Sequence, residues 1–337
     1  MMRERSQSKY ALEIRDLAVE YRTIEWTARA LNGLDLSIEK GKTLGLVGET
    51  GAGKTTAGLS IMGLIPNPPG RIASGSILLE GEELLTKTER EYRKIRGKKV
   101  SMIFQDPMSS LNPVLTIEDQ LTEVIETHEH LSNRECRKKA EQMLELVGIP
   151  ADRITEYPHQ FSGGMKQRVV IAIALACTPA LLIADEPTTA LDVTIQAQVL
   201  ETMKNLKNMY SMSMLMITHD LGIVADVCDS VSVIYAGRVV EHGSLEDVFD
   251  HTRHPYTIGL FNSLPNMKDR TMKLKPIKGL MPDPGNLPRG CTFAERCDYA
   301  QGMCREVYPE KIYRNKEHYV RCHLYLSKTI ESEMWNR

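Results

Sequence analysis

The sequence predicts an α/β fold in which short buried strands alternate with helices. The apolar runs 43–47 (TLGLV), 181–184 (LLIA) and 214–218 (MLMIT) have the length and composition of strands buried on both faces. A glycine-rich loop, two carboxylates and a histidine follow these runs in turn. Because ligands of open parallel sheets bind beyond the carboxyl ends of the strands, we expect the three polar stretches to form one site.

The loop at 48–56 (GETGAGKTT) fits the phosphate-binding pattern G-x-x-x-x-G-K-S/T, and an apolar helical stretch follows it. Glycines let backbone amides converge on an anion, and the helix start adds a positive end. Lys54 is expected to reach the β- and γ-phosphates, and the Thr55 hydroxyl to bind Mg²⁺. The alternative is a glycine-rich turn with a surface lysine. We assign nucleotide binding to the whole loop, Gly48, Glu49, Thr50, Gly51, Ala52, Gly53, Lys54, Thr55 and Thr56.

Charged side chains at the ends of two further strands are candidates for catalysis. Asp185 is expected to hold Mg²⁺, and Glu186 to accept a proton from an attacking water. His219 is placed to hydrogen-bond the γ-phosphate and to orient that water. The alternatives are plain surface charge for the two acids and a structural role for the histidine.

A second anion-binding helix start lies between these strands. Ser162, Gly163 and Gly164 precede a long helix with apolar periodicity, and they combine a hydroxyl with free backbone amides. One nucleotide does not need two such sites within one chain. Upstream, the run VSMIF predicts a strand that ends at Gln105.

The pattern becomes helical over about 107–165 and predicts a helical subdomain inserted in the α/β domain. Ile117, Leu121 and Ile125 share one helix face, and Ser132 with Glu135 predicts a capping box that starts a second helix. We expect two domains, an ATPase domain over 1–250 and a small cysteine-rich extension over 251–337.

Composition limits the partners and the compartment. The net charge of −2 balances 42 basic against 44 acidic residues, so no overall positive field attracts nucleic acid. The longest apolar run, VVIAIALAC, is far shorter than the ~20 residues that cross a bilayer. No apolar stretch follows the charges at the N-terminus, so we expect no secretory signal and an action in the cytosol.

Seven cysteines are an odd number, and a reducing cytosol disfavours disulfides. Four of them crowd into the last fifth of the chain with the spacing C-x5-C-x6-C-x17-C. The C-x2-4-C pairs that zinc sites favour are absent, whereas four separated thiolates can hold the corners of a four-iron four-sulfur cluster. Zinc and unmetallated thiols remain the alternatives for Cys291, Cys297, Cys304 and Cys322.

Taken in order, GETGAGKTT, FQD, FSGGMKQR, LLIADEPTTALD and ITHD resemble the ATP-binding subunit of an ABC transporter, a P-loop NTPase. The resemblance covers residues 10 to about 250 and implies a nucleotide sandwich dimer. In that dimer Ser162 and Gly164 of one subunit close over the ATP on the phosphate loop of the other. The resemblance further implies that Gln105 links Mg²⁺ and the attacking water to the coupling interface, and that Asp192 lies in the loop between subunits.

The same resemblance implies an aromatic residue that stacks on adenine shortly after the first strand. Tyr21 stands at the matching position, with Trp26 as the alternative. The family's usual glutamine after the signature is Met165 here, which leaves the phosphate contacts of Ser162 and Gly164 intact.

The C-terminal stretch HPYTIGLFNSLP and the four cysteines resemble the extension of oligopeptide and dipeptide transporter ATPases. This resemblance implies a 4Fe-4S cluster and ATP-driven uptake of di- and oligopeptides. It also implies a second, unlike ATPase subunit, two membrane permeases, an extracytoplasmic substrate-binding protein and a peripheral position on the cytoplasmic face of the membrane. The alternatives are a cargo such as nickel chelates or sugars, a mechanical ATPase acting on ribosomes or DNA, and an iron–sulfur sensor.

Overall fold

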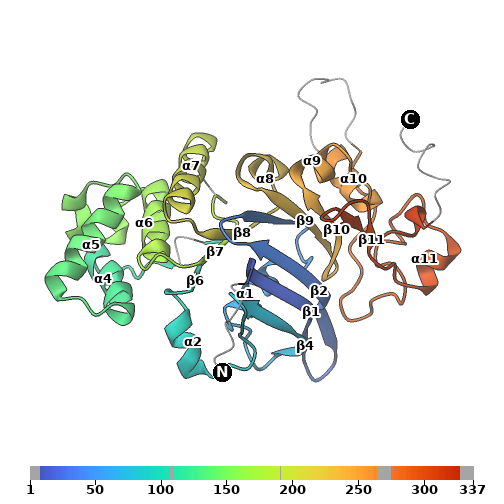
Figure 1. The fold of residues 1–337 in the computed structure, drawn as a ribbon, viewed down its shortest axis with the longest axis horizontal. Coiled ribbons are helices and arrows are strands. Elements are labelled where there is room, and N and C mark those ends of the chain that lie inside the picture. The colour runs from blue at the N-terminus through green and yellow to red at the C-terminus, as the bar shows by residue number, and fades with distance from the viewer. Residues whose placement is uncertain (1–7, 107–109, 190, 264–274, 327–337) are drawn as a thin grey trace, which may run out of the picture.

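The protein is described here from a computed structural model that covers residues 8–106, 110–189, 191–263 and 275–326. Its centre is a sheet of parallel strands that continues at one edge into antiparallel strands (Figure 1). Each buried strand predicted from the sequence is present. The strand order is β11 (Ile312–Tyr313), β12 (Tyr319–Val320), β10 (Arg238–Ser244), β9 (Ser230–Tyr235), β3 (Thr43–Val47), β8 (Ser213–Thr218), β7 (Leu181–Asp185) and β6 (Val100–Ile103).

A second, antiparallel sheet packs over one face of the main sheet. Helix α1 (Lys54–Ile61) lies between the two sheets, where Ala57 and Ile61 are fully buried (Figure 1). Leu44 and Leu46 of β3 face the same apolar cluster. The strands of this second sheet are β2 (Thr27–Glu39), β1 (Tyr10–Arg22), β4 (Gly70–Leu79) and β5 (Glu82–Glu83).

The opposite face of the main sheet is covered by helices that follow its strands. Met214 and Met216 of β8 point into this second apolar cluster, because successive side chains of a strand alternate between faces. The helices that contribute to it include α6 (Gly163–Leu175), α7 (Val193–Met209), α8 (Leu221–Val227), α9 (Leu245–Phe249) and α10 (Pro255–Asn262).

The helical insertion forms one end of the molecule (Figure 1). The predicted capping box is confirmed: Ser132 and Glu135 bond reciprocally at the start of α5, and the stripe Ile117, Leu121 and Ile125 is fully buried. Residues 107–109 of the expected subdomain lie outside the described residues, and its boundaries stay a prediction. This end contains α4 (Ile117–His128), α5 (Asn133–Leu146), η1 (Ala151–Thr155) and η2 (Pro158–Gln160), with α2 (Glu89–Ile95) beside it.

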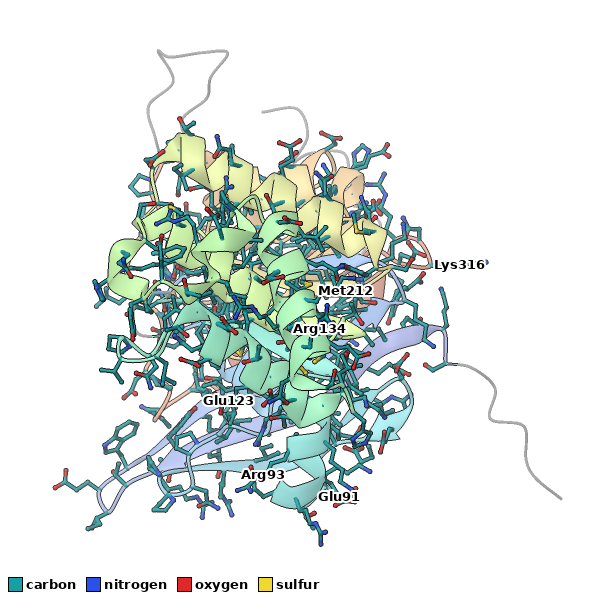
Figure 2. The ribbon with its side chains drawn as sticks, turned by 90° about the vertical axis from the view of Figure 1, so that its left-hand side faces the viewer. Glu91, Arg93, Glu123, Arg134, Met212 and Lys316 are labelled. Carbon is teal, nitrogen blue, oxygen red and sulfur yellow. The ribbon has the colours of Figure 1, made fainter. Side chains whose placement is uncertain are left out.

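Figure 2 shows this end of the molecule with its side chains. Glu123 of α4 and Arg134 of α5 are exposed there, as are Glu91 and Arg93 of α2. The apolar stripes of α4 and α5 are turned inward. In the part of the chain that the structure covers, none of the helices has the length and apolarity needed to cross a bilayer.

Within the described residues after 250, the strands join the main sheet and no separate sheet forms. Strand β12 pairs with β10 and β11 pairs with β12, so this segment extends the edge of the central sheet. Helix α11 (Gly302–Glu306) and η3 (His323–Tyr325) complete it. Residues 264–274 and 327–337 of the predicted extension lie outside the described residues, and the boundary at 250 remains a prediction.

Candidate nucleotide site

The phosphate loop connects β3 to α1, as the sequence predicts. Glycine is required at Gly53, where φ is +103° and a Cβ atom would lie 2.6 Å from the carbonyl oxygen of Ala30. Gly48 has the same need for a different reason, because its Cβ would lie 2.3 Å from the carbonyl oxygen of Ile234. The neighbouring backbone therefore fixes the path of the loop from both sides.

Lys54 is the first residue of α1 and lies folded under the loop. Its Nζ donates hydrogen bonds to the carbonyl oxygens of Gly48 (2.7 Å) and Glu49 (3.1 Å), and only 7% of the residue is exposed. Burial lowers the pKa of Lys54, while the carboxylates of Glu186 and Asp185 oppose that effect. The ammonium is thus partly desolvated and aimed across the loop, where it would meet phosphate oxygens.

Asp185 is the last residue of β7 and is almost fully buried. Burial raises the pKa of its carboxyl group, and a hydrogen bond with the Thr55 side chain acts in the opposite direction. A carboxylate and a hydroxyl in contact are the hard oxygen ligands that Mg²⁺ prefers. The donor set therefore fits the magnesium ion expected at Thr55 and Asp185.

Glu186 follows directly and lies at the centre of a polar cluster. Its carboxylate accepts from Thr189 Oγ1 (3.0 Å) and from Gln105 Nε2 (3.4 Å), and its other oxygen lies 3.0 Å from His219 Nδ1. Burial works against ionisation, yet the hydrogen bonds from His219 and Thr189 lower the pKa of Glu186 overall. An ionised carboxylate at this place can accept a proton from water.

The structure thus brings Gln105, Glu186 and His219 together from three different strand ends, as the sequence predicts. The strand before Gln105 ends at Ile103, two residues earlier than expected, so Gln105 lies in the loop beyond it. Thr189 was not predicted. Glu186 also adopts a left-handed φ of +47°, a strained conformation for a glutamate that is typical of functional sites.

The second helix start has the predicted form. Ser162 is the N-cap of α6, and its hydroxyl accepts the amide of Met165 at 3.4 Å. Glycine is also required at position 164 for packing, because a Cβ there would lie 2.5 Å from Ile195 Cγ2 of α7. Asp192 caps α7 by accepting the amide of Ile195 at 3.0 Å. The expected roles of Ser162, Gly163, Gly164 and Asp192 between subunits stay predictions.

The two candidates for adenine stacking differ in exposure. Tyr21 pairs with Ala28 and Gly70 near the end of β1 and packs against the apolar cluster between the sheets. Trp26 lies in the hairpin loop beyond, and 52% of it is exposed. The choice between them remains a prediction.

Two functional candidates were missed because they come from far along the chain. The amide of Glu49 donates to the Tyr256 hydroxyl at 2.9 Å, and the Arg296 guanidinium bonds both carboxylate oxygens of Glu49. The phosphate-loop pattern leaves position 49 unspecified, so it gives no sign of these contacts. The only indication was that Tyr256 lies in the HPYTIGLFNSLP stretch.

The expected iron–sulfur site is not confirmed. Across the described ranges, no group of three or more His, Cys, Asp or Glu side chains is arranged to hold a metal ion. Three of the four side chains divide between two apolar environments: Cys291 and Cys297 pack against the main helical cluster, and Cys322 packs with Val320 and Leu324. Burial raises the pKa of Cys291 to about 11 and that of Cys322 to about 12, so both thiols are neutral at pH 7.

Two family models match separate parts of this chain. Residues 31–189 match the model described as ABC transporter. Residues 240–304 match the model described as oligopeptide/dipeptide transporter, C-terminal region.

Among curated proteins, three relatives from Bacillus subtilis (strain 168) are similar over nearly the whole chain. The oligopeptide transport ATP-binding protein AppD is 51% identical, with 95% of this chain and 98% of that protein covered. The oligopeptide transport ATP-binding protein OppD is 49% identical, with 92% and 87% covered. The dipeptide transport ATP-binding protein DppD is 47% identical, with 93% and 94% covered.

Two solved structures are similar to about 70% of this chain. The ATP-binding cassette MJ0796, solved as a dimer in a post-hydrolysis state bound to ADP and Pi, superposes with a TM-score of 0.62 and 27% identity, covering 69% of this chain and 98% of that one. The protein cbiO1 from Clostridium perfringens gives the same TM-score and identity over 72% and 92% of the two chains. By sequence identity and coverage, this chain belongs to the ATP-binding proteins of the oligopeptide and dipeptide ABC transporters.

Proposed function

We propose that this chain binds and hydrolyses ATP to energise the uptake of di- and oligopeptides through a membrane complex. The observation that carries the proposal is the convergence of Lys54, Asp185, Glu186 and His219 at the carboxyl ends of β3, β7 and β8. This is where an open parallel sheet binds its ligand. The phosphate loop lies at the same edge.

The proposed reaction uses groups of this chain at each step. Backbone amides of the loop and the Lys54 ammonium bind the phosphates. The water oxygen attacks the γ-phosphorus, the bond to the ADP oxygen breaks, and Glu186 takes the proton that the water loses. His219 and Gln105 hold Glu186 in place and orient the water. Thr55 and Asp185 would hold Mg²⁺, which would supply positive charge against the phosphates.

We further propose that two cassettes close over the nucleotides, with Ser162, Gly163 and Gly164 of one facing the phosphate loop of the other. The relative MJ0796 was solved as a dimer bound to ADP and Pi, which supports this arrangement. The second cassette would be an unlike ATPase subunit. Two permeases and a substrate-binding protein would complete the complex, and this chain would lie on the cytoplasmic face of the membrane.

Peptide cargo is favoured over nickel chelates, sugars or a role on ribosomes or DNA, because the relatives AppD, OppD and DppD are named for oligopeptide and dipeptide transport. The test is uptake of a labelled oligopeptide into proteoliposomes that contain this chain with its cognate subunits. We expect uptake that needs ATP on the side of this chain. Recovery of the chain with ribosomes, and no membrane association when the permeases are present, would contradict the proposal.

We also propose that Cys291, Cys297, Cys304 and Cys322 take up a 4Fe-4S cluster, with zinc as the alternative occupant. The support is proximity: Cys304 and Cys297 lie near enough to Cys291 to add to the burial that raises its pKa, the same holds for Cys322 beside the other three, and the Cys291 amide donates to the Cys304 carbonyl at 2.7 Å. The thiols would have to move and ionise to bind it. Iron, sulfide and zinc analysis after anaerobic purification tests this, with Cys291→Ser as the control. Metal-free protein would refute it.

A further inference from the structure

The second residue of the phosphate loop is held by a distant part of the chain. The carbonyl oxygen of Glu49 accepts from Lys54 Nζ, within the loop. Its amide and its carboxylate both point away from the loop, toward the segment after β10. All three polar groups of this residue are hydrogen-bonded, and for two of them, the amide and the carboxylate, the partner lies more than 200 positions away.

The Arg296 guanidinium forms a bidentate ion pair with the Glu49 carboxylate. Nη1 and Nη2 donate to the two carboxylate oxygens at 2.7 and 3.0 Å. Nη1 also donates to the Tyr235 hydroxyl at 3.2 Å, and Nε donates to the Lys278 carbonyl at 2.8 Å. Only 7% of the Arg296 side chain is exposed. A bidentate pair whose guanidinium is largely buried has a fixed geometry, which a surface ion pair lacks.

Tyr256 holds the backbone of the same residue. It is fully buried, and its hydroxyl accepts the Glu49 amide at 2.9 Å. Its ring lies 4.6 Å from that of Tyr235 and 5.4 Å from that of Phe293, so two other aromatic rings hold the Tyr256 side chain in place. Tyr235 ends β9, which is the strand beside β3, so this support rests on the central sheet.

We propose that Arg296 and Tyr256 are positioning residues of the nucleotide site, so that the C-terminal segment forms part of the ATP-binding apparatus of its own chain. Holding Glu49 fixes where the loop leaves β3 and keeps its carbonyl oxygen against Lys54. The remaining loop amides are then already arranged for phosphate when the nucleotide arrives. Preorganisation of a loop raises affinity because less ordering is left for the binding step. This inference rests on the nucleotide site proposed above.

The competing explanation is that the contacts only attach the C-terminal segment to the body of the protein. Attachment alone would change the stability of that segment and leave nucleotide affinity as it is. A positioning role changes affinity in a chain that remains folded. Coupling between Arg296 and Glu49 in the binding constant itself therefore separates the two explanations.

The experiment measures binding of Mg·ADP to the full-length chain by calorimetry. The variants are Arg296→Met, which keeps the stem of the side chain, Glu49→Gln, Tyr256→Phe and the double variant Arg296→Met/Glu49→Gln. Arg305→Met is the matched control, because Arg305 is an exposed arginine of the same segment. Hydrogen exchange of the peptide that contains residues 48–56 is followed in the nucleotide-free proteins.

We expect each single variant to weaken Mg·ADP binding about three- to tenfold, with faster exchange in the loop peptide. The double variant should be no weaker than Arg296→Met alone, because both changes remove one interaction. Arg305→Met should bind like the wild type. If Arg296→Met does not fold, Glu49→Gln and Tyr256→Phe carry the test, since the first alters a partly exposed carboxylate and the second removes one oxygen.

Unchanged affinity in folded Glu49→Gln and Tyr256→Phe would overturn the inference while leaving the proposed ATPase function in place. Losses that add in the double variant would overturn it too, since they would mean that the two residues act separately. Absence of Mg·ADP binding to the wild-type chain is a different result, because it would refute the proposed function itself.

Discussion

The nucleotide site and the C-terminal segment are built by opposite means. At the site, the functional residues Gly53, Lys54, Asp185, Glu186 and His219 belong to short stretches at the ends of β3, β7 and β8 or directly after them. In the segment, the contacts that determine its position join side chains far apart in sequence. A site encoded in short motifs can be recognised from the sequence, whereas a long-range network cannot.

Glu241 is the clearest example of a long-range network in the C-terminal segment. This carboxylate of β10 is fully buried and accepts the amides of Arg253 (2.7 Å) and His254 (3.0 Å). It also lies 3.2 Å from Nε2 of the fully buried His318. One side chain therefore ties the start of α10 and the strand region near β12 to the central sheet.

The largest expected effect lies in the nucleotide site. Glu186→Gln keeps the shape of the side chain but removes the base, so ATP turnover should fall about a thousandfold while Mg·ATP still binds. Turnover is measured in the complete complex and binding in the isolated chain. Turnover near that of the wild type would show that Glu186 is not the base.

The next effect tests the network of the C-terminal segment. In Glu241→Gln one carboxylate oxygen becomes an NH₂ group, which faces at least one of the groups that now donate to Glu241. The free energy of unfolding should therefore fall by about 3 kcal/mol. Denaturant unfolding of the full chain measures it. Glu246→Gln, an exposed glutamate of α9, is the control and should stay within about 0.5 kcal/mol. Equal losses of stability in the two variants would show that Glu241 does not hold the C-terminal segment to the sheet.

A pH titration probes the same segment without altering it. Burial lowers the pKa of His254 to about 3, and its Nδ1 accepts the Tyr256 amide at 3.0 Å. The unfolded chain takes up a proton near pH 6.5 and the folded chain does not, so this contribution is complete above pH 6.5 and is lost as the pH falls. About 3 kcal/mol should disappear by pH 4.

The matched variant for this titration is His254→Asn, whose side-chain oxygen can still cap α10 but does not titrate. Stability should then depend less steeply on pH between 6.5 and 4. An identical slope in the two proteins would mean that His254 does not remain neutral in the folded chain.

The smallest effect belongs to a motif that is purely local. Ser132→Ala removes the hydroxyl of the capping box at α5, which accounts for about 1 kcal/mol of stability. Hydrogen exchange in α5 should rise, while Mg·ATP binding stays unchanged. Lys138→Ala, at an exposed position of the same helix, is the control. A change in nucleotide affinity would contradict the separation of local from long-range effects.

The sequence predicted the elements that a short local pattern identifies. The strands predicted at 43–47 and 181–184 (the second observed at Leu181–Asp185), the helix start at Ser162 and the cap at Ser132 are examples. It placed the end of β6 two residues too late, at Gln105, because the apolar Phe104 continues the run without continuing the strand.

The contacts that were not predicted join residues far apart. Arg296 and Glu49 are 247 positions apart, and nothing in the two residue types indicates that they would pair. For the four cysteines, the spacing did not predict the packing, because Cys291 and Cys297 pack against one apolar cluster and Cys322 lies in another. Burial of this kind depends on tertiary structure, which a spacing pattern does not contain.

The most direct test of the account is a calorimetric titration of the Glu186→Gln variant with Mg·ATP. The same titration is then made on the double variant Glu186→Gln/Lys54→Ala. The first variant turns over the ligand about a thousandfold more slowly, so the heat reports almost entirely binding. We predict saturable binding at one site, weakened about a hundredfold or more when the Lys54 ammonium is removed from the loop. Equal affinity in the two proteins, or no binding in the first, would contradict the claim that this loop holds the nucleotide.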